Sequence, residues 1–179
     1  MVSTMTLTYG TLGMLPARAA RRWGGREALY FRGRRQTFAE LAAGVDRVAR
    51  GLIALGIRPG DKVALWLLNR PEWIVIAFAV MKIGAVLVPI NTRLRTEDVA
   101  YIVDQSDSTT LILAERSGPI DYLGMVRELV PENATPGAGR LPKLERLVVL
   151  GETSRPATVP WALLLERAGQ VNEIGRAHV

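Results

Sequence analysis

Short runs of apolar residues alternate with helix-like segments along most of this chain, and this alternation limits the folds open to it. The runs are KVALWLL at 62–68, AVLVPI at 85–90, TTLILAE at 109–115 and RLVVLGE at 146–152. Strands that are apolar on both faces are typical of parallel sheets covered by helices on each side. Helices between such strands indicate right-handed crossovers within one sheet. The sequence therefore predicts an α/β fold with a doubly wound, mostly parallel sheet and helices on both faces.

The helices between these strands carry boundary signals. Thr37 and Glu40 form a T-x-x-E capping box, after which apolar residues recur every three or four positions. Pro71 suits the first turn of a helix that is apolar almost all round, which predicts burial. Helices are accordingly expected from Leu12 to Trp23, from Thr37 to Gly56, from Pro71 to Gly84, from Thr96 onward, and over Ile120–Val130.

Arginine is frequent in the N-terminal third and makes the chain basic. The formal net charge is +6 and the sequence pI is about 10.3. Nucleic-acid binding would need these residues on one recognition helix or interleaved with aromatic rings. Several of them instead lie in WGGREALYFRGRRQTF at 23–38, which predicts two short strands joined by a turn. We therefore expect solvated arginines and no nucleic-acid partner.

The apolar stretch from Trp73 to Ile90 has about the length of a membrane span, by the rule of roughly 20 residues. Lys82 lies in its middle, and a charge at the bilayer centre is costly. A buried helix followed by a strand explains the stretch better. The N-terminus also lacks a secretory signal, so we expect a cytoplasmic protein without a transmembrane span.

Residues for several kinds of catalysis are missing from the sequence. There is no cysteine, and the only histidine, His178, is the next-to-last residue. This composition excludes cysteine nucleophiles and disulfides, and it leaves no His-based triad or metal site outside the tail. Neither G-x-G-x-x-G after a strand nor G-x-x-x-x-G-K-[ST] occurs. The residues alone therefore predict a scaffold without a catalytic constellation.

The loop after AVLVPI is the best candidate for a ligand contact. Ligands of open parallel sheets bind beyond the carboxyl ends of the strands. Pro89 fixes the direction in which the chain leaves the strand, and Asn91 and Thr92 supply polar groups there. An ordinary turn explains these residues equally well.

Two motifs give the chain a family resemblance. TFAEL at 37–41 is similar to the first core motif of the adenylate-forming (AMP-binding) enzymes, Thr-Tyr-x-Glu-Leu, and MKIGAVLVPIN at 81–91 is similar to their second, Lys-x-Gly-Ala-x-x-x-Pro-[Leu/Ile]-[Asn/Asp]. RPGDKVAL and NRPEW join them. From about residue 11 to about residue 170 the chain resembles the N-terminal part of acyl-CoA synthetases, most closely the fatty-acid–CoA ligases, and hence an incomplete N-terminal subdomain of their fold.

The resemblance implies a two-step reaction on a carboxylic acid. The carboxylate attacks the α-phosphorus of ATP, giving an acyl-adenylate and pyrophosphate, and the thiol of coenzyme A (CoA) then displaces AMP. ATP, Mg²⁺ and CoA are thus implied for the full-length family. The resemblance places Asn91, Thr92 and Arg93 near the pantetheine path of CoA, and Arg116 as a further contact.

The working parts of such an enzyme are not found in this sequence. It has no Ser/Thr/Gly-rich phosphate loop, which the family carries after the last segment seen here. We therefore expect residues 1–173 to be an N-terminal fragment that is inactive alone and binds none of these cofactors tightly. Residues 174–179, IGRAHV, match a translated sequencing adapter and are expected to be a non-native tail. A carrier-loading adenylation domain or a non-catalytic α/β interaction module remain alternatives.

Overall fold

The computed structural model describes residues 10–130, 137, 139–151 and 156–172, and it contains a five-stranded parallel sheet. Every neighbouring pair of strands in this sheet runs in the same direction, which confirms the predicted fold class. The predicted tail at 174–179 and His178 lie outside the described residues. The strands, in spatial order, are β4 (Val86–Pro89), β3 (Lys62–Trp66), β5 (Ser108–Ala114), β8 (Arg146–Leu150) and β9 (Val159–Pro160).

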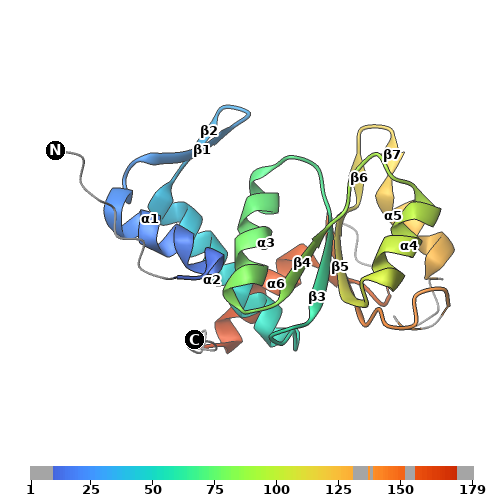
Figure 1. The fold of residues 1–179 in the computed structure, drawn as a ribbon. Helices are drawn as coiled ribbons and strands as arrows, with labels where there is room; N and C mark the ends of the chain where they lie inside the picture. Colours follow the sequence, from blue (N-terminus) through green and yellow to red (C-terminus); the bar gives the residue numbers. More distant parts are fainter. Residues whose placement is uncertain (1–9, 131–136, 138, 152–155, 173–179) are drawn as a thin grey trace.

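Helices cover both faces of the sheet (Figure 1). On one face α3 (Pro71–Lys82) and α6 (Trp161–Arg167) both pack against the long helix α2 (Phe38–Ala54). On the opposite face α4 (Thr96–Gln105) and α5 (Tyr122–Leu129) pack against β5 and against each other. The crossover helix α3 therefore lies on one face and the crossover helices α4 and α5 lie on the other, as in a doubly wound sheet.

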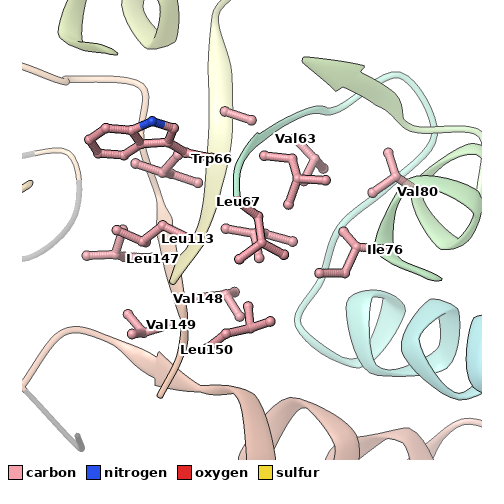
Figure 2. Packing of buried hydrophobic residues seen from close by; sticks show 14 of the residues in the cluster. Val63, Trp66, Leu67, Ile76, Val80, Leu113, Leu147, Val148, Val149 and Leu150 are labelled. Carbon is pink, nitrogen blue, oxygen red and sulfur yellow. The ribbon is translucent and has the colours of Figure 1, made fainter. Parts of the chain in front are cut away.

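The core lies between these layers and is built from the apolar runs seen in the sequence. Val63 of β3 lies near Ile76 and Val80 of α3 (Figure 2), and all three side chains are fully buried. Trp66 is fully buried at the carboxyl end of the same strand. The central strands are thus buried on both faces, as their composition predicts.

Helix α2 begins as the sequence predicts. The Thr37 hydroxyl accepts a hydrogen bond from the Glu40 backbone N–H at 3.2 Å, and Glu40 Oε2 accepts one from the Thr37 backbone N–H at 2.7 Å. These reciprocal bonds satisfy two donors that a helix start would otherwise leave unpaired. Gly56 closes the helix with a φ of 82°, a conformation that favours glycine.

The N-terminal residues form the expected short helix and hairpin. A 3₁₀ turn (η1, Leu12–Met14) leads into α1 (Leu15–Trp23), and β1 (Glu27–Phe31) then pairs antiparallel with β2 (Arg34–Thr37). At the hairpin tip Arg32 and Gly33 both have positive φ, as a two-residue type I′ turn requires. The side chains of Arg32, Arg34 and Arg35 are exposed, as predicted.

Strand β4 lies at the edge of the sheet and pairs only with β3. Its first residue, Val86, is 47% exposed, although the strand has the same apolar composition as the buried ones. Pro89 occupies the last position, where an edge strand tolerates the missing N–H. The stretch 73–90 is thus a helix and a strand, and every helix among the described residues is too short or too polar to cross a membrane.

The structure differs from the sequence-based expectation near residue 120. The helix predicted over Ile120–Val130 begins at Tyr122, because Ile120–Asp121 forms strand β7, which pairs with β6 (Arg116–Ser117) in a short hairpin. Asp121 instead caps the helix, with its Oδ1 accepting a hydrogen bond from the Gly124 N–H at 2.8 Å. The sequence analysis also missed β9 and α6, as well as the second 3₁₀ turn η2 (Ala168–Gln170).

Candidate functional site

Three segments leave the sheet together at the carboxyl ends of β3, β4 and β5 (Figure 1). They hold residues 67–70, 90–95 and 115–119 respectively. In an open parallel sheet this edge is where ligands bind. All four predicted contact residues lie here, with Asn91, Thr92 and Arg93 after β4 and Arg116 after β5.

The loop after β4 is a tight turn ordered by its own polar groups. Asn91 Oδ1 accepts a hydrogen bond from the Arg93 backbone N–H at 2.9 Å, so Asn91 forms a side-chain turn of the kind typical for this residue. Nη1 of Arg95 donates to the carbonyl oxygens of Arg93 at 2.8 Å and of Leu94 at 3.0 Å. Arg93 is exposed and has no carboxylate partner among the described residues. Its guanidinium is therefore available to an anion.

The turn after β4 also contacts the first residue of helix α5. The hydroxyl of Tyr122, the first residue of α5, donates to the Thr92 carbonyl oxygen at 3.4 Å. The Tyr122 ring packs edge-on against Trp66, with ring centroids 4.7 Å apart. The structure thereby connects the segment after β4 to the segment after β5, although β3 lies between them in the sheet.

Arg116 lies in a cleft with a volume of about 830 Å³. The β1–β2 hairpin forms one wall, the start of α3 the second, and the β6–β7 turn the third. Residues 91–93 do not line it. The structure thus brings the four predicted residues to one edge, but it places only Arg116 in this cleft. The charged residues that line the cleft are Arg32, Arg34, Arg35, Glu40, Arg70, Glu72 and Arg116.

Both carboxylates in the cleft have partners. Arg70 donates from Nε to Glu72 Oε2 at 2.8 Å and from Nη2 to Glu72 Oε1 at 2.9 Å. These bonds lower the pKa of Glu72 below its ordinary value and raise the pKa of Arg70. Glu40 is held by the backbone and side chain of Thr37, which lower the pKa of its carboxyl as well. Both carboxylates are therefore charged at neutral pH.

The remaining charge of the cleft is positive. Arg35 forms an ion pair with Glu27 on the hairpin, and its guanidinium lies over the Tyr30 ring. Arg34 and Arg116 have no carboxylate partner in the part of the chain that the structure describes. The arrangement favours an anionic group between the hairpin and the sheet edge.

The sequence analysis missed the contribution of Asn69 and Arg70 to this cleft. Asn69 and Arg70 form a bend between β3 and α3. The available signal was their position, since polar residues directly after a buried parallel strand lie at the ligand-binding edge. The hairpin arginines gave no such signal, because their approach to β6 is set by tertiary structure alone.

Two kinds of cofactor site, a cluster of metal ligands and a Gly-rich phosphate loop, are not found in the part of the chain that the structure describes. The described residues hold no cluster of three or more His, Cys, Asp or Glu side chains that fits a metal ion. The sequence carries no Gly-rich loop of the Walker or dinucleotide-binding type. The guanidinium groups of Arg93 and Arg116, which have no carboxylate partner among the described residues, suit the phosphate groups of an anionic ligand.

The sequence and the fold are those of a known family. Residues 16–165 match the AMP-binding enzymes, and the chain belongs to that family. The protein YngI of Bacillus subtilis (strain 168), whose name assigns it to the acyl-CoA synthetases, is 34% identical over 162 residues. Triostin synthetase I of Streptomyces triostinicus is 37% identical over 120 residues, which cover 67% of this chain and 23% of that protein.

Solved structures agree with this assignment. The anthranilate CoA ligase AuaEII, in complex with anthranoyl-AMP, superposes with a TM-score of 0.75 at 26% identity, over 88% of this chain and 28% of that one. The match to YngI likewise covers 87% of this chain but 30% of that protein. The chain thus spans less than a third of the length of these relatives.

Proposed function

We propose that this chain acts as the N-terminal part of an ATP-dependent acyl-CoA ligase. In the proposed reaction a carboxylate oxygen attacks the α-phosphorus of ATP and pyrophosphate leaves. The sulfur of CoA then attacks the acyl carbon, AMP leaves with the former carboxylate oxygen, and the thiol proton is released. The observation that carries the proposal is the match of residues 16–165 to the AMP-binding enzymes.

The described residues contribute to the second step of this reaction. The ordered turn at residues 91–93 and the unpaired guanidinium of Arg116 lie at the same sheet edge. We assign Asn91, Thr92, Arg93 and Arg116 to CoA binding, with the two arginines holding phosphate groups. ATP and any Mg²⁺ are bound mainly by residues of the longer enzyme, so the 179-residue chain alone should not form an acyl-adenylate.

A fatty acid is the proposed substrate. NRPEW at 69–73 and PINTRL at 89–94 are the segments that resemble the fatty-acid-activating branch of the family. The anthranilate ligase among the similar structures shows that the same fold also serves an aryl acid. A panel of fatty acids of increasing length and aryl acids therefore decides the substrate class.

The test uses the enzyme produced from the complete open reading frame. Pyrophosphate release is measured with ATP and each acid of the panel, first without and then with CoA. The proposal predicts release that depends on one class of acid and a thioester product that depends on CoA. An enzyme that releases no pyrophosphate with any carboxylic acid would contradict it.

Two arginine variants test the assigned contacts. Arg93→Ala and Arg116→Ala should each raise the KM for CoA by about tenfold or more, because each removes a charge-assisted hydrogen bond. The acid-dependent exchange of pyrophosphate into ATP should not change, since CoA takes no part in it. Arg21→Ala is the matched control, because Arg21 is exposed on α1. An unchanged KM for CoA in both variants would remove these residues from the site.

A carrier-loading adenylation domain is the second candidate function. It is kept as a candidate because the chain is 37% identical over 120 residues to triostin synthetase I, whose name does not place it among the CoA ligases. The two functions share the first step and differ in the acceptor thiol. Transfer of the acyl group to a phosphopantetheinylated carrier protein, without transfer to free CoA, would identify the second function.

A further inference from the structure

Tyr122 occupies a central position between the two candidate contact segments. Its side chain is 1% exposed, and its ring meets the Trp66 ring edge-on, at an interplanar angle of 83°. The hydroxyl reaches past Trp66 to the Thr92 carbonyl oxygen in the turn after β4. A buried tyrosine needs a hydrogen-bond partner for its hydroxyl, and Thr92 supplies it from a segment thirty residues away.

Tyr122 is also tied directly to the hairpin that carries Arg116. Arg116 of β6 lies opposite Asp121 of β7 in the strand register of that hairpin, and Tyr122 is the residue after Asp121. The Leu123 backbone N–H donates to the Glu115 carbonyl oxygen at 3.2 Å, which attaches the start of α5 to the end of β5. The backbone at Tyr122 is therefore fixed relative to the β6–β7 hairpin.

The packing around Tyr122 limits its movement further. Asp121 caps α5, and a Cβ at Gly124 would lie 2.8 Å from the Asp121 Cγ atom, so the first turn of this helix is closely packed. Trp66 is fully buried at the end of the central strand β3. Its indole N–H has no hydrogen-bond partner within the described part of the chain, so Trp66 acts on Tyr122 through ring packing.

The turn at 91–93 is attached to its own side of the sheet just before it begins, where the Ile90 backbone N–H donates to the Leu65 carbonyl oxygen at 2.9 Å. It follows β4, an edge strand with a single neighbour in the sheet. The hydrogen bonds of the Asn91 and Arg95 side chains shape the turn internally, but they do not attach it to the rest of the sheet edge. The Tyr122 hydroxyl adds an attachment at the middle of the turn, from the segment that follows β5.

We propose that Tyr122 is a positioning residue: it holds the turn at 91–93 at a fixed distance from Arg116 and thereby sets the affinity of the enzyme for CoA, which it does not touch. The proposal rests on the function proposed above. It concerns the acceptor step alone, because the turn and Arg116 are both assigned to CoA. Loss of the hydroxyl should thus weaken CoA binding and leave adenylation intact.

The test compares Tyr122→Phe with Tyr101→Phe in the enzyme from the complete open reading frame. Tyr101 is 68% exposed on α4 and serves as the matched control. Tyr122→Phe should raise the KM for CoA about fivefold, as expected from the loss of one neutral hydrogen bond. The kcat at saturating CoA and the acid-dependent exchange of pyrophosphate into ATP should stay at their wild-type values, and Tyr101→Phe should change none of the three.

A second variant separates positioning from general packing. Tyr122→Leu removes the ring as well as the hydroxyl, so it should raise the KM for CoA further than Tyr122→Phe does. A wild-type KM for CoA in Tyr122→Phe, or an exchange rate that falls in parallel with CoA affinity, would overturn the positioning role while the proposed function stands. A wild-type enzyme without acid-dependent exchange would overturn both.

Discussion

Two glycines of helix α2 should respond in opposite directions to the same substitution. A Cβ built at Gly51 would lie 2.5 Å from the Leu164 carbonyl oxygen and 2.7 Å from its Cδ2 atom. Real Cβ atoms do not come this close to other atoms, so α6 would have to move away from α2. A Cβ at Gly44 has Val75 methyl groups at 3.8 Å as its nearest neighbours, which is ordinary van der Waals contact.

The expected magnitudes follow from two opposing effects. Alanine is favoured over glycine in a helix interior by about 1 kcal/mol. At Gly44 this gain is unopposed, so Gly44→Ala should stabilise the chain by about 0.5–1 kcal/mol. At Gly51 overpacking against a backbone carbonyl costs about 1–3 kcal/mol or more, which outweighs the gain. Gly51→Ala should therefore destabilise the chain by about 1–2 kcal/mol.

Urea denaturation of the two variants and the wild type, followed by circular dichroism, measures the difference. The midpoint should rise for Gly44→Ala and fall for Gly51→Ala, with equal m-values. In a thermal melt the two variants should differ by roughly 3–12 °C, given about 2–4 °C per kcal/mol for a chain of this size. Stabilisation by Gly51→Ala would refute the close packing of α2 on α6.

Three further substitutions test other parts of the structure. Thr37→Ala should lower the free energy of unfolding, measured by urea denaturation, by about 1 kcal/mol, because it removes the capping box. Thr37→Ser keeps a hydroxyl and should retain most of this stability. Equal losses in both variants would contradict a capping role for the Thr37 hydroxyl. The lowered pKa of Glu72 means that its ion pair with Arg70 stabilises the fold above the ordinary glutamate pKa and is lost as pH falls through the lowered value. The free energy of unfolding of the wild type should therefore exceed that of Glu72→Gln at pH 6, and this difference should disappear by pH 3. The difference should be less than about 1 kcal/mol, because the pair is about one third exposed. A difference that stays constant across this range would exclude the effect. Val86→Lys should reduce self-association in light scattering with a stability change within about 0.5 kcal/mol, since it charges an open sheet edge; undiminished association would show that this edge is not the contact.

The strands and their common direction could be predicted from the sequence, but their order could not. AVLVPI at 85–90 and TTLILAE at 109–115 have similar apolar composition, yet β4 lies at the edge and β5 in the centre. The crossover after β3 places β4 on one side of β3, and the next crossover places β5 on the other side. The residue types in the strands do not encode these sides. Strands β6 and β7, of two residues each, are too short for any alternating pattern.

From the sequence, candidate site residues could be proposed only where they closely follow a predicted strand. Asn91, Thr92 and Arg93 were proposed as contacts because they come after an apolar run, at or next to the end of a family motif. Tyr122 was not, because the contact of its hydroxyl with Thr92 joins segments thirty residues apart and depends on how α5 packs. The cleft was missed for the same reason, since its walls come from three separate parts of the chain.

Transfer of an isotope from the substrate to AMP tests the central claim most directly. The enzyme from the complete open reading frame is given ATP, CoA and its carboxylic acid labelled with ¹⁸O in both carboxylate oxygens, and the products are analysed by mass spectrometry. Formation of an acyl-adenylate predicts one ¹⁸O atom in the phosphate of AMP and none in pyrophosphate. Label in inorganic phosphate, with ADP as the nucleotide product, would contradict the proposed function.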